Sequence, residues 1–132
     1  MSELLSREEF KKQVFAKTSG KCCVPGCNCD AADAHHIMDR KLWSNGGYYL
    51  FNGAALCNKH HLDAENSVIL PNACLKYMNI NPEDCFIPDK LKEKYKNDSK
   101  LSYHNDLKNG RIDKWGNDVN QEYDSNWYKR FK

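Results

Sequence analysis

The chain has 132 residues, of which 40% are hydrophobic and 29% charged, so it fits one domain with a thin core. A net charge of +2 is too small to indicate a nucleic-acid partner by itself. No apolar run approaches the length of a membrane span or a secretion signal, which excludes a membrane partner. Seven cysteines cannot all pair as disulfides, and clustered cysteines more often hold metal in a reducing compartment. We therefore expect a cytoplasmic, intracellular, metal-binding protein.

The N-terminal part of the chain predicts one helix followed by a cysteine-rich turn. Ser6 and Glu9 have the spacing of a capping box, a common start of a helix. Apolar residues then recur at helical spacing, which predicts a helix over residues 7 to 17. Residues 21 to 29 hold four cysteines around a Pro-Gly pair, a composition that favours a tight knuckle.

Two strands and a helix are expected next, in that order. Residues 33 to 38 form a candidate strand. The aromatic and apolar residues 48 to 51 favour a second strand after a Gly-Gly turn, and Asn52-Gly53 is interpreted as its end. A short helix is expected over residues 59 to 66.

Beyond Pro71 the pattern is less regular. A helix is expected near residues 73 to 78, and two further prolines break the chain before a polar tail. Residues 90 to 114 hold eight basic and four acidic side chains, with Tyr95 and Tyr103 among them. This stretch is a weak footprint of a phosphate-binding surface, and it fits a solvated lysine-rich face equally well.

Two close pairs of soft ligands give the strongest signal in the chain. Cys22 and Cys27 form the first pair, and Cys57 and His60 form the second. Four thiolate and imidazole ligands suit tetrahedral zinc, which would tie together the flanks of a long hairpin in a chain with little core. We assign these four residues to a structural Zn²⁺ site, with Cys23 as an alternative to Cys22.

The remaining cysteines have weaker signals. Cys29 stays open as a further ligand because it lies in the same knuckle. Cys74 and Cys85 are isolated, and isolated cysteines are most often small buried hydrophobic residues or idle thiols. The spacing of cysteines and histidines does not match the usual Cys2His2 zinc finger.

Four of the five histidines fall in two adjacent pairs beside these cysteines, which is more than one zinc ion can use. With them, residues 19 to 66 resemble the HNH family, also called the ββα-metal nucleases. The matching pieces, in order, are Gly20-Lys21-Cys22, Cys27, His35-His36-Ile37, Gly46-Gly47, Asn52, Leu56-Cys57 and His60-His61. The chain departs from the family in its wider first cysteine pair and in His60, where the family most often has cysteine.

The resemblance implies an α+β fold with a small ββα-metal core of the zinc-knuckle, treble-clef-like kind. Residues 1–70 would form this core together with an N-terminal helix. Residues 71–132 would form a mostly irregular or helical C-terminal extension that packs on the core and contacts nucleic acid. The implied activity is that of a hydrolase, an endonuclease that cuts phosphodiester bonds in nucleic acid, DNA rather than RNA, as a monomer or homodimer.

The resemblance also implies a role for each residue of the site. His36 would be the general base, a task that the near-neutral pKa of histidine suits, and Asn52 would orient the loop that carries it. His35 and His61 resemble ligands of a catalytic metal, and Glu65 lies four residues after His61 on the same face of the expected helix. Imidazole and oxygen ligands fit Mg²⁺ or Mn²⁺ and also permit Zn²⁺ or Ni²⁺.

Arg40, Lys41 and Trp43 follow the histidine doublet directly, in a connection that would face the substrate. We predict phosphate contacts for them. The alternative for Trp43 is that its ring is mostly buried and covers the small core. Asp33 is separated from the doublet by one residue and is expected to have a structural role at the start of the strand. His104 is expected at the surface.

Two other functions fit parts of the pattern. One is a catalytically silent zinc-binding module that recognises nucleic acid or a protein partner. The other is a thiol redox protein that uses Cys22 and Cys23, or Cys27 and Cys29, but this function leaves the paired histidines unexplained.

Overall fold

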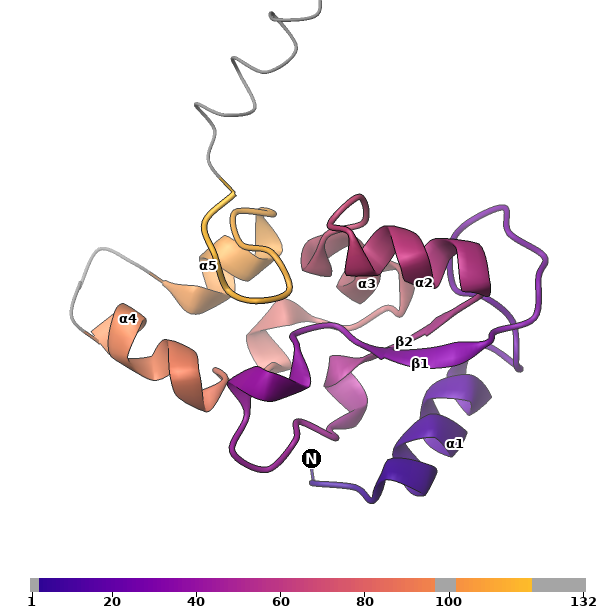
Figure 1. Cartoon of the computed structure of the whole chain (residues 1–132), viewed down its shortest axis with the longest axis horizontal. Coiled ribbons are helices and arrows are strands. Elements are labelled where there is room, and N and C mark those ends of the chain that lie inside the picture. The colour runs from indigo at the N-terminus through magenta and orange to yellow at the C-terminus, as the bar shows by residue number, and fades with distance from the viewer. Residues whose placement is uncertain (1–2, 97–101, 120–132) are drawn as a thin grey trace, which may run out of the picture.

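The computed structural model describes residues 3–96 and 102–119, which form five helices and one small antiparallel sheet (Figure 1). The helices are α1 (Arg7–Lys17), α2 (Asn58–Glu65), α3 (Pro71–Tyr77), α4 (Lys92–Lys96) and α5 (Tyr103–Lys108). The strands are β1 (Asp33–His36) and β2 (Gly53–Leu56). Short 3-10 turns cover Arg40–Leu42, Leu50–Asn52, Pro82–Asp84 and Asp89–Leu91. The fold is thus mixed helix and strand.

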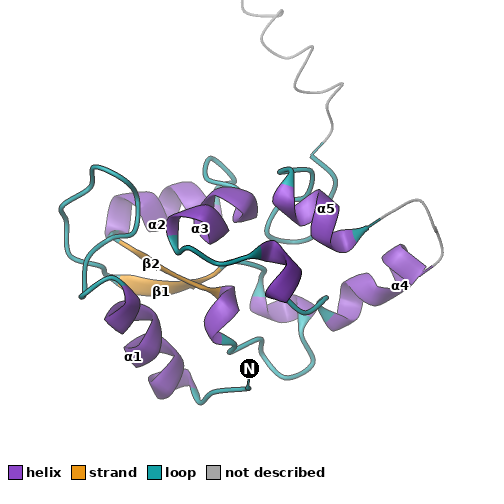
Figure 2. Cartoon of the chain, turned by 180° about the vertical axis from the view of Figure 1, so that it is seen from behind, coloured by secondary structure: helices purple, strands orange, loops and turns teal. Residues whose placement is uncertain are grey.

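The sheet lies between helices, with α1 on one face and α2 and α3 on the other (Figures 1 and 2). His35 pairs with Ala54 and His36 with Gly53, so the histidine doublet occupies the end of β1. Adjacent residues of a strand point to opposite faces. The two imidazoles therefore belong to different sides of the sheet.

Helix α1 has the predicted bounds, and its start has the predicted cap. The side-chain oxygen of Ser6 accepts a hydrogen bond from the backbone N–H of Glu9 at 3.1 Å. Phe10 and Val14, one turn apart, are buried against the sheet. The predicted helix over residues 59 to 66 is confirmed as α2, and the one near residues 73 to 78 as α3, which starts at Pro71.

The predicted first strand is confirmed but is shorter, whereas the predicted second strand over residues 48 to 51 is wrong. Leu50–Asn52 forms a 3-10 turn, and the strand is Gly53–Leu56, which begins inside the Asn-Gly pair that was interpreted as a break. The reason is tertiary packing: a Cβ on Gly53 would collide with a methyl of Val14. Close approach to α1 thus outweighs the β propensity of the aromatic residues.

Residues of the C-terminal part join the same hydrophobic core. Leu107 and Ile112 are each 1% exposed and belong to the core cluster that contains Phe10. Cys74 and Cys85 are buried free thiols, as expected. Residues 97–101 of the lysine-rich stretch and residues 120–132 of the polar tail lie outside the described part.

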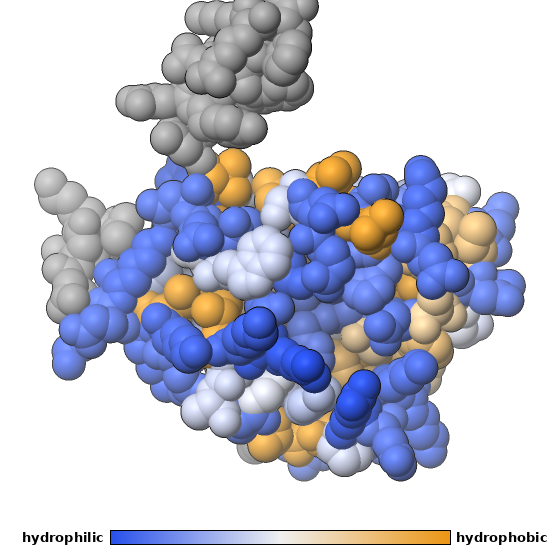
Figure 3. Space-filling model, viewed as in Figure 1, coloured by the Kyte–Doolittle hydropathy of each residue, from blue (hydrophilic) through white to orange (hydrophobic). Residues whose placement is uncertain are grey.

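The exterior is mainly hydrophilic on the face shown in Figure 3, with apolar side chains in separate patches. Within residues 3–96 and 102–119, no helix combines the length and the apolar character needed to span a membrane.

The contact between Gly53 and α1 gives a first prediction. Gly53→Ala should lower the free energy of unfolding by about 1–3 kcal/mol, because the added methyl overpacks the contact with Val14 and Phe10. Urea denaturation measures this cost. Val14→Ala removes the closest methyl group, so the double variant should lose less stability than the sum of the two single variants. Strictly additive costs would contradict the proposed close approach.

Candidate metal and catalytic centre

Cys22, Cys27, Cys57 and His60 form a cluster that can hold a metal ion such as zinc. Their ligand atoms all lie within 4.8 Å of one another. Nδ1 of His60 lies 3.5 Å from Sγ of Cys22 and 3.2 Å from Sγ of Cys57, and the sulfur atoms of Cys27 and Cys57 lie 3.9 Å apart. Zinc–ligand bonds in a tetrahedral site give edges of about 3.6 Å between nitrogen and sulfur and about 3.8 Å between two sulfurs. The observed spacing fits this geometry.

Backbone hydrogen bonds lower the pKa of two of these thiols. Cys57 lies at the start of α2, where the backbone amide of His60 lowers the pKa of its thiol. The backbone amide of Cys29 likewise lowers the pKa of Cys27. Since the thiolate is the ligand form, both shifts favour metal binding.

Cys23 and Cys29, the two cysteines left open as ligands, are not members of this cluster. Cys22, not Cys23, belongs to the cluster, and burial raises the pKa of Cys23 to about 12. Cys29 is exposed and lies outside the four-residue set, although its carbonyl accepts a hydrogen bond from the N–H of Cys22. The backbone N–H of Cys23 donates to Ala55 of β2, which ties the knuckle to the sheet.

His35, His61 and Glu65 form a second cluster that can hold a metal ion. Oε1 of Glu65 lies 3.4 Å from Nδ1 of His35 and 3.4 Å from Nε2 of His61. The rings of His35 and His61 meet edge to face, with centroids 5.2 Å apart. Nδ1 of His35 is buried and has no hydrogen-bond partner among the described residues. A buried nitrogen of this kind, aimed at a carboxylate and a second imidazole, fits a metal ligand.

The charge states of these side chains also suit a cation. Burial, and next the charge of Lys114, lowers the pKa of His35 to about 3, so its imidazole stays neutral near pH 7. Burial alone would raise the pKa of Glu65, but the hydrogen bond and charge of Lys114 and the two histidines outweigh it, and the net shift is downward. The cluster thus offers the neutral imidazole of His35, the imidazole of His61 and the carboxylate of Glu65.

His36 lies on the other side of β1 from His35 and packs against aromatic rings. Phe10 of α1 stacks on its imidazole with ring centroids 4.9 Å apart, and Tyr48 meets it edge to face at 4.8 Å. Burial, and next the charge of Arg40, lowers the pKa of His36. The ring is therefore held in place as a neutral imidazole able to accept a proton.

Asn52 fixes the loop that follows His36. It is 2% exposed, and its Oδ1 accepts a hydrogen bond from the backbone N–H of Met38 at 2.8 Å. Its Nδ2 donates to the carbonyls of Met38 at 3.0 Å and Gly47 at 3.2 Å. The side chain thus bridges the two ends of the β1–β2 connection.

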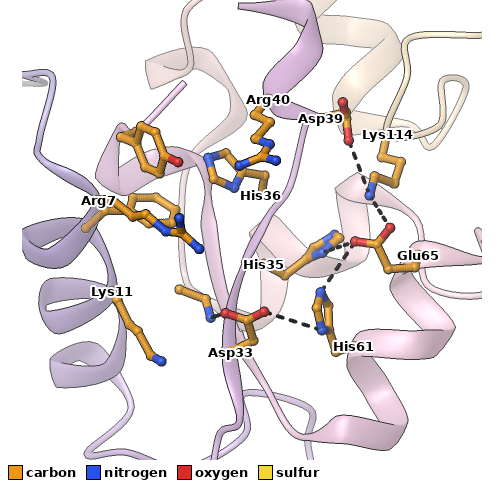
Figure 4. A pocket seen from close by; sticks show the side chains of 13 residues that line it. Arg7, Lys11, Asp33, His35, His36, Asp39, Arg40, His61, Glu65 and Lys114 are labelled. Carbon is orange, nitrogen blue, oxygen red and sulfur yellow. Dashed lines mark hydrogen bonds and ion pairs between the residues drawn. The ribbon is translucent and has the colours of Figure 1, made fainter. Parts of the chain in front are cut away.

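One cavity of about 340 Å³ contains both His36 and the second metal-binding cluster (Figure 4). The two histidines of β1 reach it from opposite sides of the strand, and α1, α2 and the β1–β2 connection supply other parts of its wall. Its charged and polar lining residues are Arg7, Lys11, Asp33, His35, His36, Asp39, Arg40, Tyr48, His61, Glu65 and Lys114.

The predicted phosphate-binding residues have different positions. Arg40 is exposed and lines the cavity beside His36, whereas Lys41 is exposed but is not part of the lining. Trp43 is only 6% exposed, and its indole N–H donates to the carbonyl of Met38. Trp43 thus belongs to the hydrophobic core, which is the alternative given for it, and it does not line this cavity.

Several residues of the cavity were not predicted. Arg7 and Lys11 lie one turn apart on α1 and point into it (Figure 4), a pairing that the i, i+4 spacing of the predicted helix could have revealed. Lys114 reaches the site from the C-terminal part, 49 residues from its partner Glu65. No local pattern signals a contact over that separation.

Asp33, expected to have a structural role, lies at the start of β1, whereas His104, expected at the surface, is half-buried. Asp33 starts β1, and its Oδ1 accepts a hydrogen bond from the backbone N–H of Ala34, while its Oδ2 lies 3.8 Å from Nδ1 of His61. Asp33 therefore stands at the edge of the second cluster. Nε2 of His104 donates a hydrogen bond to the carbonyl of Cys85 at 2.7 Å, and this side chain is therefore less exposed than predicted.

The chain matches no protein-family model, no curated protein and no solved structure in the comparisons with known proteins. Its chemistry is therefore inferred from the side chains of the two clusters and the cavity.

The four-ligand cluster predicts a metal-dependent fold. The purified protein should retain about one Zn²⁺, and Cys57→Ser should lose that ion and about 4 kcal/mol or more of unfolding free energy. Elemental analysis and thermal unfolding measure the two effects. Cys29→Ser is the matched control and should keep both zinc and stability. Equal zinc loss in both variants would contradict the assigned ligand set.

The buried hydrogen bonds of Asn52 predict a large loss of stability when its side chain is shortened. Asn52→Ala should lower the free energy of unfolding by about 2–4 kcal/mol, because it leaves the buried N–H and carbonyl of Met38 without their side-chain partners. Asn45→Ala serves as the control in urea denaturation, since Asn45 is exposed and should cost under about 1 kcal/mol. Similar costs for the two variants would mean that Asn52 is only a turn residue.

Proposed function

We propose that the protein is a metal-dependent endonuclease of the HNH, or ββα-metal, type that hydrolyses phosphodiester bonds in nucleic acid. DNA is the proposed substrate rather than RNA. The observation that carries this proposal is the shared cavity, in which one neutral histidine stands beside a separate cluster of two imidazoles and a carboxylate.

His36 is the proposed general base. Hydrolysis needs a water molecule that gives up a proton as its oxygen attacks phosphorus, while the bond from phosphorus to the leaving sugar oxygen breaks. A neutral imidazole accepts that proton, and the lowered pKa of His36 keeps it neutral near pH 7. The stacking with Phe10 and the contact with Tyr48 hold the ring in one orientation, and Asn52 orders the loop behind it.

His35, His61 and Glu65 are the proposed ligands of a divalent ion, Mg²⁺ or Mn²⁺, with Zn²⁺ or Ni²⁺ as alternatives. When bound, such an ion supplies charge stabilisation for the leaving oxygen and the phosphate. The buried Nδ1 of His35 without a hydrogen-bond partner supports this assignment.

Three basic side chains in the lining of the cavity support a phosphodiester substrate. Arg7, Lys11 and Arg40 line the cavity, and Arg7 and Arg40 lie near His36 in Figure 4. Arginine pairs with the oxygens of a phosphate in a planar, two-point geometry, and lysine adds a point charge. These contacts would hold the sugar-phosphate backbone without reading its sequence.

The order of the elements is a further support. A strand with the histidine doublet, a second strand and a helix with His61 and Glu65 follow one another, as the ββα name of the family describes. The four-ligand cluster fixes the start of that helix to the cysteine-rich knuckle. In the proposal, this cluster is structural and the second cluster serves the reaction.

The test is cleavage of plasmid DNA, single-stranded DNA and RNA by the zinc-containing protein with Mg²⁺ or Mn²⁺ added. His36→Ala should lower cleavage at least about 100-fold, because general-base catalysis contributes a factor of this size. The zinc content should stay unchanged and the variant should stay folded, although it loses the ring contacts with Phe10 and Tyr48. His104→Ala removes a histidine outside the cavity and should cleave like the wild type.

Two outcomes would count against the enzyme. Undiminished cleavage by His36→Ala would identify another base or a contaminating nuclease. Tight binding of nucleic acid without turnover under every ion tried would favour the catalytically silent zinc-binding module.

A further inference from the structure

Lys114 is a buried cation at the metal-binding cluster. It is 4% exposed, and its Nζ lies 2.7 Å from Oε2 of Glu65 and 3.6 Å from Oδ1 of Asp39. Its backbone carbonyl accepts a hydrogen bond from the N–H of Asp39 at 2.7 Å, which fixes the C-terminal segment against the loop after β1. Burial of an ammonium group is costly unless the group is paired, so the two carboxylates are needed to keep Lys114 in this place.

The two oxygens of Glu65 are divided between two partners. Oε1 faces His35 and His61, at 3.4 Å from a nitrogen of each, whereas Oε2 accepts the hydrogen bond from Lys114 (Figure 4). A carboxylate can bind a metal ion through one oxygen or through both. With Lys114 in place, only one oxygen of Glu65 is directed toward the histidines.

Lys114 is poorly suited to bind the substrate phosphate itself. Its ammonium group is enclosed and is shared by two carboxylates. Arg7 and Arg40, by contrast, are exposed side chains that line the same cavity. The position of Lys114 therefore indicates an effect on Glu65 and not a direct contact with nucleic acid.

We propose that Lys114 is a positioning residue that restricts Glu65 to one ligand oxygen and thereby keeps part of the metal ion free for water and phosphate. The proposal rests on the function proposed above, because it takes His35, His61 and Glu65 as the ligands of the reaction's metal. It assigns a task at the centre to a residue of the C-terminal extension.

The proposal predicts that loss of Lys114 raises the affinity for the metal ion but lowers the rate of cleavage. Without the lysine, Glu65 loses its competing partner and can turn both oxygens to the ion, and a nearby positive charge is also removed. Lys114→Met should therefore bind Mn²⁺ about tenfold more tightly, because one neighbouring charge is removed. It should also carry less metal-bound water and cleave about 10–100-fold more slowly. A merely structural role predicts weaker binding together with slower cleavage.

The experiment uses the full-length, zinc-containing protein. Titration with Mn²⁺ followed by electron paramagnetic resonance gives the dissociation constant, and proton relaxation of water gives the hydration of the bound ion. Lys114→Arg keeps the charge and should have the wild-type affinity for Mn²⁺ and the wild-type hydration of the bound ion. Lys94→Met is the matched control, because Lys94 also pairs with a carboxylate, that of Asp118, and lies over the tyrosine ring next to it. It should behave like the wild type.

Zinc content and thermal unfolding show whether each variant is folded. If Lys114→Met does not fold, Lys114→Gln keeps a donor for Glu65 without the charge. It should bind Mn²⁺ more tightly than the wild type but keep the wild-type hydration of the ion, because Oε2 of Glu65 still has its partner. Unchanged or weaker Mn²⁺ binding in folded Lys114→Met or Lys114→Gln would overturn the proposal even if the wild type cleaves DNA. Tighter binding with less hydration, in a protein that cleaves no nucleic acid, would support the role of Lys114 and contradict the nuclease.

Discussion

The pairing of β1 with β2 is the constraint on which the site depends. Because the doublet of His35 and His36 lies at the end of a strand, its two side chains must project to opposite faces. One imidazole then meets α2 with His61, and the other meets α1 with Phe10. Two adjacent residues thus serve two different environments, which a helix or an irregular loop would not enforce.

A second feature of this small protein is a group of charged side chains around one buried lysine. Lys114 bridges Glu65 and Asp39 in a chain whose core is thin, and such a cluster adds little stability over a hydrophobic packing of similar volume. A purely structural need would be met by apolar side chains. The clustering of Glu65 with His35 therefore favours a role in binding a cation over a role in folding.

Local signals made much of the fold and site predictable. The cap at Ser6 and the helical period predicted α1, and the two close pairs of soft ligands predicted the four-residue cluster. The resemblance to a nuclease family, with the four-residue spacing of His61 and Glu65, predicted the second cluster. Three features depend on tertiary contacts instead: the true second strand, the burial of Trp43 and the insertion of Lys114 beside Glu65. Propensity scales and short-range spacing carry no information on such contacts.

The wrong prediction of the second strand and the unpredicted basic residues Arg7 and Lys11 of the cavity have one physical cause. The small residues at the start of β2 weaken its sequence signal, but they allow α1 to approach the sheet so closely that a methyl on Gly53 would collide with Val14. That approach brings Phe10 onto the imidazole of His36 and Arg7 and Lys11 to the wall of the cavity. The feature that hides the strand from sequence analysis is therefore the one that lets an N-terminal helix complete the proposed active site.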